Sequence, residues 1–81
     1  MSVTLAEGNV GQVYTVLNSA LPQQVEKRME ALGMTRGSQL RVLHKKNSGT
    51  LVILLRGTRF AVGRGLTSNI QVKEASEWKT K

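Results

Sequence analysis

The sequence predicts a mainly β fold, a small barrel of about five strands with one α-helix inserted between the first and second strands. Three observations predict it. Short runs rich in β-branched and apolar residues recur along the chain, separated by turn residues. One stretch, residues 22–32, has apolar residues at helical spacing. A chain of 81 residues is too small for a two-sheet sandwich, so its few strands are expected to close into a barrel.

Length and composition predict one globular domain over residues 1–81, with a core over 3–73 and a loosely ordered tail over 74–81. Apolar residues make up 40% of the chain and charged residues 21%, as in soluble globular proteins. There is no cysteine, which excludes disulfides and thiolate metal sites. The sequence shows neither a secretory signal nor an apolar run of about 20 residues that could span a membrane. The expected compartment is therefore the cytosol.

The first strand and the helix come before residue 33. Residues 10–17 alternate two sets of side chains, with Tyr14 and Val16 on one face, and predict a strand. Pro22 suits the first turn of a helix, because its fixed φ is helical and its missing N–H is not needed there. The helix is predicted over residues 22–32. One apolar stripe would pack on the sheet, formed by Val25, Met29 and Leu32.

A hinge, Leu32-Gly33-Met34-Thr35-Arg36-Gly37, connects this helix to the next strand. Gly33 follows the last apolar position of the helical pattern, where a residue with positive φ commonly ends a helix. Gly37 marks the entry into the strand. The sequence therefore predicts that the helix folds over the barrel at this point.

Four further strands are predicted after the hinge. In the first of them, Leu40, Val42 and His44 share the inner face, opposite a basic outer face. Five consecutive apolar residues, 51–55, predict burial on both faces of the next one. Turns are expected at residues 46–49 and 56–58, and a helical or 3₁₀ turn at 66–69. The predicted strands cover residues 38–46, 50–55, 59–63, which places Phe60 and Val62 on the inner face, and 70–72.

The order of elements favours an SH3-like barrel. An OB-fold also has five strands and one helix, but its helix follows the third strand. Here the helix lies between the first and second strands, so the SH3-like barrel is preferred.

Positive charge is concentrated in the second half of the chain. The formal net charge is +7, and seven cations with no carboxylate lie between Arg36 and Arg64. Such a charge attracts an acidic protein surface, nucleic acid or anionic lipid. A basic surface that serves only solubility is the simpler interpretation.

Two motifs resemble those of the FeoA family. The hinge residues 32–37 fill the first motif, and Gly57-Thr58-Arg59-Phe60-Ala61-Val62 with Ile70-Gln71-Val72 fill the second. The resemblance covers about residues 3–73 and departs from the family at Arg36, where proline is usual, and at Thr67, where alanine is frequent. The structural positions of the motifs are Leu32, Gly33, Gly37, Gly57, Ala61, Ile70 and Val72.

The resemblance implies an SH3-like module, also found at the C-terminus of iron-dependent repressors, and a role in ferrous iron uptake. FeoA proteins are small cytosolic partners of the membrane GTPase transporter FeoB. We therefore expect an accessory protein that docks on FeoB and modulates transport, located in the cytosol or peripherally at the inner face of the membrane. The expected contact residues are Arg36, Arg41, Arg56, Arg59, Arg64 and Met34.

Neither catalysis nor metal binding is expected. His44 is the single histidine, and between two lysines it is a poor start for a ferrous site, which needs converging imidazole and carboxylate ligands. We expect it to be packed or hydrogen-bonded. Glu26 and Glu30 are one helical turn apart and are expected on the solvent side of the helix. The sequence thus predicts no enzyme, no cofactor and no metal site.

Three other partners remain open. A basic barrel could track the phosphates of nucleic acid, although few aromatic residues are available for base stacking, namely Tyr14, Phe60 and Trp78. An anionic membrane surface would be attracted by the same charge. Weak self-association is the third alternative, because small barrels with apolar strands can pair.

Overall fold

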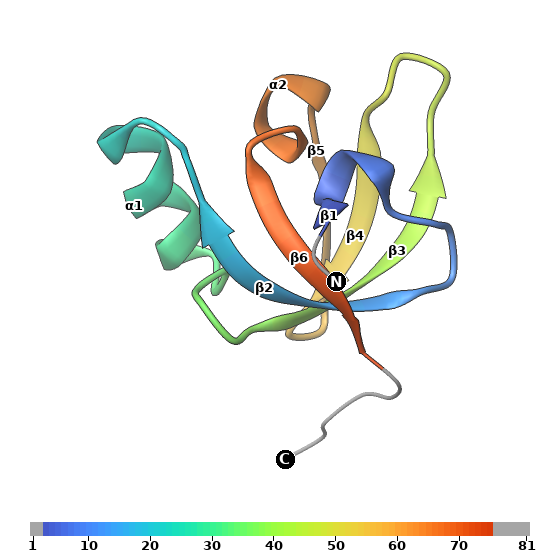
Figure 1. Cartoon of the computed structure of the whole chain (residues 1–81), viewed down its shortest axis with the longest axis horizontal. Helices are drawn as coiled ribbons and strands as arrows, with labels where there is room; N and C mark the ends of the chain where they lie inside the picture. Colours follow the sequence, from blue (N-terminus) through green and yellow to red (C-terminus); the bar gives the residue numbers. More distant parts are fainter. Residues whose placement is uncertain (1–2, 76–81) are drawn as a thin grey trace.

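The computed structural model describes residues 3–75 and contains one six-stranded antiparallel sheet with a helix, α1, at one end (Figure 1). The strands follow the order β1-β6-β2-β3-β4-β5 across the sheet. The predicted mainly β class and the position of the helix are confirmed. The elements are β1 (Val3–Thr4), the 3₁₀ helix η1 (Leu5–Glu7), β2 (Val13–Ser19), α1 (Gln23–Ala31), β3 (Gln39–Lys45), β4 (Leu51–Leu55), β5 (Thr58–Val62), α2 (Arg64–Thr67) and β6 (Ile70–Ala75).

The sheet curls around the core but does not close, which corrects the predicted barrel. β1 and β5 lie at opposite ends of the strand order, and each pairs with one neighbour only within the described part of the chain. The sixth strand, β1, was not predicted. Its two residues form a strand because they pair with the distant β6, Val3 opposite Val72, and a two-residue segment has too few positions to show alternation.

The concave side of the sheet holds the core. Each strand from β2 to β6 contributes alternate side chains, and η1, α1 and the hinge add one residue each. In β4, Leu51, Ile53 and Leu55 are fully buried on the core face. Val52 and Leu54, on the opposite face, are only half-buried, so the two faces that the sequence predicted to be buried are not buried equally. The buried core consists of Leu5, Tyr14, Val16, Met29, Met34, Leu40, Val42, Leu51, Ile53, Leu55, Val62, Ile70 and Val72.

A β-bulge interrupts the alternation in β3. Val42 lies opposite Ile53 but His44 lies opposite Val52, so Leu43 is an extra residue between them. A bulge of this kind shifts the side chains that follow it by one position. His44, which we expected on the inner face and packed or hydrogen-bonded, is instead exposed.

The turn between β4 and β5 is tight. Arg56 and Gly57 connect the paired residues Leu55 and Thr58, and their φ angles of 53° and 80° are those of a type I′ turn. This hairpin fixes the register of β5 and leaves Arg56 exposed at the turn.

The last strand is longer than predicted. It continues from residue 72 to Ala75, because Glu74 and Ala75 pair with β2. The short helix before it, α2, begins at Arg64 rather than Leu66. The rest of the predicted tail, with Trp78, lies outside the described residues. Within residues 3–75, no helix is long and apolar enough to cross a membrane.

Candidate functional site

The hinge ends α1 in a Schellman motif, which confirms the predicted role of Gly33. The N–H of Met34 donates to the Met29 carbonyl at 2.9 Å, and the N–H of Gly33 donates to the Glu30 carbonyl at 2.9 Å. Gly33 has φ of 100°, a conformation that costs little only for glycine. The chain therefore reverses direction at a fixed point at the end of the helix.

This motif exchanges the expected roles of Leu32 and Met34. Leu32 is the C-cap and is 44% exposed, although the sequence placed it on the core stripe. Met34 was expected to contact a partner, but it is 6% exposed and belongs to the core with Met29. The reason is geometric, because the Schellman motif turns the second residue after the C-cap back toward the last turn of the helix.

A second turn follows at once. The Ser38 N–H donates to the Thr35 carbonyl at 2.9 Å, and Gly37 has φ of 90° at the third position of the turn, as in type II. Arg36 occupies the second position, which proline favours in this type of turn. The Gly37 N–H also donates to the Val16 carbonyl at 2.7 Å, which fastens the hinge to β2.

Arg56 lies across the hinge. A Cβ atom built on Gly33 would be 2.7 Å from Cδ and 3.1 Å from Nε of Arg56. The type I′ turn between β4 and β5 is thereby placed beside the end of α1. We define the hinge surface as two exposed side chains beside the end of α1: Leu32 and Arg56.

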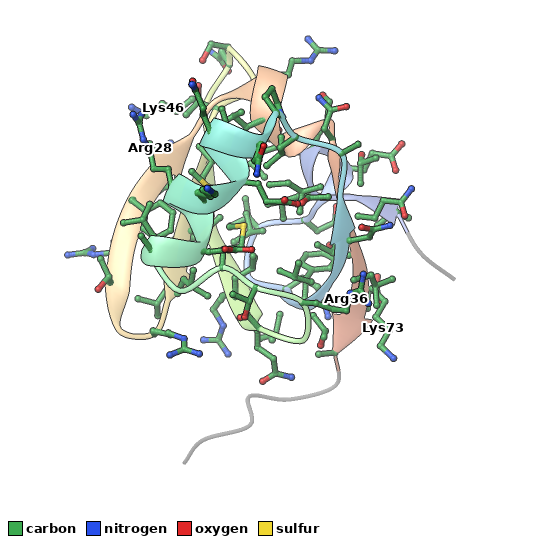
Figure 2. The ribbon with its side chains drawn as sticks, turned by 90° about the vertical axis from the view of Figure 1, so that its left-hand side faces the viewer. Arg28, Arg36, Lys46 and Lys73 are labelled. Carbon is green, nitrogen blue, oxygen red and sulfur yellow. The ribbon has the colours of Figure 1, made fainter. Side chains whose placement is uncertain are left out.

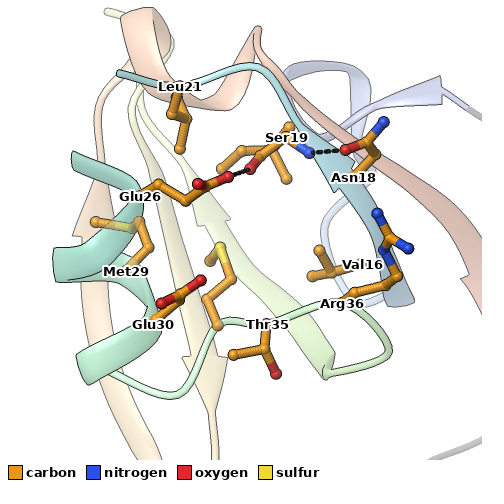
Figure 3. A pocket seen from close by; sticks show the side chains of 11 residues that line it. Val16, Asn18, Ser19, Leu21, Glu26, Met29, Glu30, Thr35 and Arg36 are labelled. Atoms are coloured by element: carbon orange, nitrogen blue, oxygen red, sulfur yellow. Dashed lines mark hydrogen bonds between the residues drawn. The ribbon is translucent and has the colours of Figure 1, made fainter. Parts of the chain in front are cut away.

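A pocket of about 230 Å³ lies between α1 and β2, beside the hinge. Figure 3 shows Glu26 and Met29 on the helix side and Asn18 and Arg36 across from them. The Ser19 hydroxyl donates to Glu26 Oε2 at 3.2 Å. The pocket is lined by Val16, Asn18, Ser19, Leu21, Glu26, Met29, Glu30, Met34, Thr35, Arg36 and Ile70.

The two helix glutamates are not simply on the solvent side, as the sequence suggested. Glu26 is half-buried, and both Glu26 and Glu30 line the pocket. Their spacing of one helical turn was visible in the sequence. The direction of their side chains was not, because it depends on how α1 is rotated against β2.

The other predicted contact residues fall into separate places. Arg41 and Arg59 lie on the outer face of the sheet, where each is paired with Leu54 from a neighbouring strand. Arg64 lies at the start of α2, within reach of the turn before β4, since a Cβ on Gly49 would be 2.9 Å from its Cδ. The five arginines thus do not form one continuous face.

Other cations are equally scattered. Figure 2 shows Arg36 and Lys73 at one side of the molecule, with Arg28 and Lys46 at the other. Lys73 is exposed on β6 and was not among the expected contact residues. The strong net charge is therefore distributed over the surface, and its effect on a partner is long-range as well as local.

The chemistry of the described side chains offers no metal cluster. Among residues 3–75, no group of three or more histidine, cysteine, aspartate or glutamate side chains comes together. His44 is exposed beside Lys45 on β3, which opposes cation binding.

Comparison with known proteins identifies the family of this fold. A family model, the FeoA domain, matches residues 3–74. A protein of Methanocaldococcus jannaschii named "Putative Fe(2+) transport protein A" is 37% identical over 49 residues. The aligned part is 60% of this chain and 58% of that protein, so the comparison spans little more than half of the relative.

Solved structures share the fold. The crystal structure of FeoA, an iron uptake regulatory protein, has a TM-score of 0.84 at 29% identity and covers 93% of this chain and 100% of that one. The FeoA protein of Chlorobium tepidum has a TM-score of 0.85 at 24% identity, covering 95% of this chain and 74% of that one. A manganese-dependent transcriptional repressor gives 0.82 at 20% identity, over 91% of this chain but 42% of the repressor.

These neighbours confirm the predicted SH3-like fold. The family model spans nearly all of the described residues, including both motifs that carried the resemblance. The chain belongs to the FeoA domain family.

Proposed function

We propose that this protein is an accessory protein of ferrous iron uptake that docks on the cytosolic part of the transporter FeoB and modulates transport. Membership of the FeoA family supports a role in ferrous iron transport. The proposed role is that of a non-catalytic adaptor without a cofactor, located in the cytosol or at the inner membrane surface.

One observation carries the proposed docking site, namely the exposure of Leu32 on the hinge surface. Among the described residues, Leu32 and Val10 are the large hydrophobic side chains that are exposed, at 44% and 58%. Only Leu32 has an arginine, Arg56, packed against the residue that follows it. Apolar anchors beside arginines are typical of the residues that dominate binding energy at protein interfaces.

The charge supports an acidic partner surface. The net charge of +7 would raise the association rate with an acidic surface, and this effect falls as salt screens the charges. Arg56, which packs against the residue after Leu32, would then be placed to meet a carboxylate beside the site where Leu32 is buried.

The test is a pull-down with the cytosolic domain of FeoB at low and moderate salt. Leu32→Asp should weaken binding by about tenfold or more, because it replaces the apolar anchor by a charge that must be desolvated. Val10→Asp is the matched control, since it changes an exposed apolar residue away from the hinge and should leave binding unchanged. Equal losses in the two variants would refute the hinge surface as the docking site.

Nucleic acid is the second candidate, favoured by the outer-face row in which Arg41 and Arg59 flank Leu54. Tyr14 is buried and Phe60 packs against the core, so these two aromatics offer no exposed stacking platform. This candidate would be favoured if the wild-type protein does not bind FeoB at low or at moderate salt concentration but does bind mixed-sequence oligonucleotides. Retention on anionic vesicles alone would favour the membrane surface.

A further inference from the structure

The strand β5 ends the sheet and leaves one edge open. It pairs with β4 on one side and, within residues 3–75, with nothing on the other. We infer that β5 accepts an extended acidic segment of a protein partner as a seventh strand. This inference deepens the proposed function and rests on it to the extent that the segment belongs to the docking partner.

The hairpin fixes which backbone groups face outward. Leu55 and Thr58 flank the two-residue type I′ turn. In such a hairpin the flanking pair forms two backbone hydrogen bonds with each other. Along the two strands, hydrogen-bonded pairs then alternate with pairs that are not hydrogen-bonded. Phe60 and Val62 are therefore bonded to β4. The N–H and C=O groups of Arg59 and Ala61 point away from it, toward the open edge.

The two edges of the sheet differ in how they are protected. The opposite edge, β1, has two residues and continues directly into η1, whose Leu5 is fully buried. β5 has five residues, contains no proline, and exposes both Arg59 and Ala61. Natural proteins commonly protect an edge strand from pairing with another chain by shortening it or by adding proline, bulges or charges. On β5, only the charge of Arg59 gives such protection.

The side chains of β5 specify the pattern of the added strand. Residues directly opposite one another on paired strands point to the same face of the sheet. A residue beside Phe60 would cover a half-buried apolar ring, whereas its neighbours would lie beside Arg59 and Ala61 on the outer face. The segment that fits best alternates apolar residues with acidic ones.

A second copy of this chain fits the edge poorly. An antiparallel pair of β5 strands centred on Phe60 would place each Arg59 beside the other copy's Ala61. The two arginines would then be diagonal neighbours about 7–8 Å apart, in a complex of two molecules that each carry +7. A carboxylate at the same position would be attracted instead, so the charge selects an acidic segment.

The probe is an acetylated and amidated octapeptide of alternating valine and glutamate, titrated into ¹⁵N-labelled protein. Binding should slow the hydrogen exchange of the Arg59 and Ala61 amides, while the amides of Phe60 and Val62 are already slow without peptide. The same peptide with lysine in place of glutamate should bind at least about tenfold more weakly. Equal binding of the two peptides, or no protection of the two amides at saturation, overturns the inference.

Two variants test the backbone and the charge separately. Ala61→Pro removes an outward N–H but no bond to β4, a position where edge strands tolerate proline, and should weaken peptide binding by about tenfold. Ala61→Ser, which keeps the N–H, should bind as wild type. If circular dichroism shows that Ala61→Pro is unfolded, Arg59→Glu provides the test instead. This variant should bind the lysine peptide more tightly than the glutamate peptide.

The outcomes separate this inference from the proposed function. If Ala61→Pro loses the peptide but FeoB still binds it as wild type, the proposed function and the edge site both stand, and FeoB is refuted as the source of the added strand. If wild type protects both amides with the peptide but does not bind FeoB, the proposed function fails and the edge site stands. Concentration-dependent dimers that Ala61→Pro abolishes would identify a second copy as the occupant and overturn the acidic partner.

Discussion

Replacing Gly33 by alanine perturbs the hinge in two ways that a matched variant separates. Gly33 and Gly37 have nearly the same φ, 100° and 90°. A Cβ on Gly37 would meet nothing within 4 Å, whereas a Cβ on Gly33 would lie 2.7 Å from Cδ of Arg56. Gly37→Ala therefore measures the backbone cost alone, and Gly33→Ala adds the displacement of Arg56.

The expected magnitudes follow from these geometries. A non-glycine residue held at positive φ costs about 1–2 kcal/mol, so Gly37→Ala should lower the free energy of unfolding by that amount. The Arg56 side chain is exposed and flexible, and moving it should add less than about 1 kcal/mol through lost packing of its stem. Gly33→Ala is thus expected to cost about 1–3 kcal/mol, and more than Gly37→Ala.

Urea denaturation of the two variants, of Arg56→Ala and of the double variant Gly33→Ala/Arg56→Ala provides the assay. The double variant should regain the part of the loss that comes from the clash, a coupling of several tenths of a kcal/mol. Strict additivity, or a Gly33→Ala loss no greater than that of Gly37→Ala, would show that Arg56 does not pack on the hinge. In thermal unfolding, each kcal/mol corresponds to about 4–8 °C for a domain of this size.

Three further predictions concern stability. Arg36→Pro should raise the free energy of unfolding by about 0.4–1 kcal/mol, because proline suits the second position of the type II turn and restricts the unfolded chain; a lower melting temperature would contradict the turn assignment. Tyr14→Phe should cost about 0.5–1.5 kcal/mol in urea unfolding, since the Tyr14 hydroxyl accepts a 2.8 Å hydrogen bond from the Asn9 N–H, and a neutral result would mean that water replaces it. Ile53→Ala should cost about 2–5 kcal/mol by the same assay, because Ile53 is fully buried, and a loss below 1 kcal/mol would place it outside the core.

The fold was predictable where local chemistry and global structure agree. The end of α1 was predictable because a glycine directly after the last apolar residue of a helical pattern commonly adopts positive φ and ends the helix. The strands β2, β3 and β5 followed from alternation and β4 from its run of five apolar residues, together with the turns between them. For the same reason, the FeoA motifs could be located at the hinge and in β5 and β6 from sequence alone.

The remaining features depend on contacts that a linear pattern does not contain. The bulge at Leu43 is a property of the pairing between β3 and β4, and it moved His44 to the outside. The exchange between Leu32 and Met34 depends on the direction in which the Schellman motif turns the chain. Glu26 reached the pocket because of the rotation of α1. Each error concerns which way a side chain points, whereas the elements that carry these residues were predicted.

The pairing of β6 with both β1 and β2 has a consequence for how the protein folds during synthesis. Val72 is paired with Val3 on one side and with Val16 on the other, so the middle of the sheet joins residues from both ends of the described chain. Such long-range pairing slows folding, because a large loop must close before the contacts form. The ribosome must therefore release residues 70–75 before the sheet can be completed, and until then one edge of β2 has unpaired backbone N–H and C=O groups.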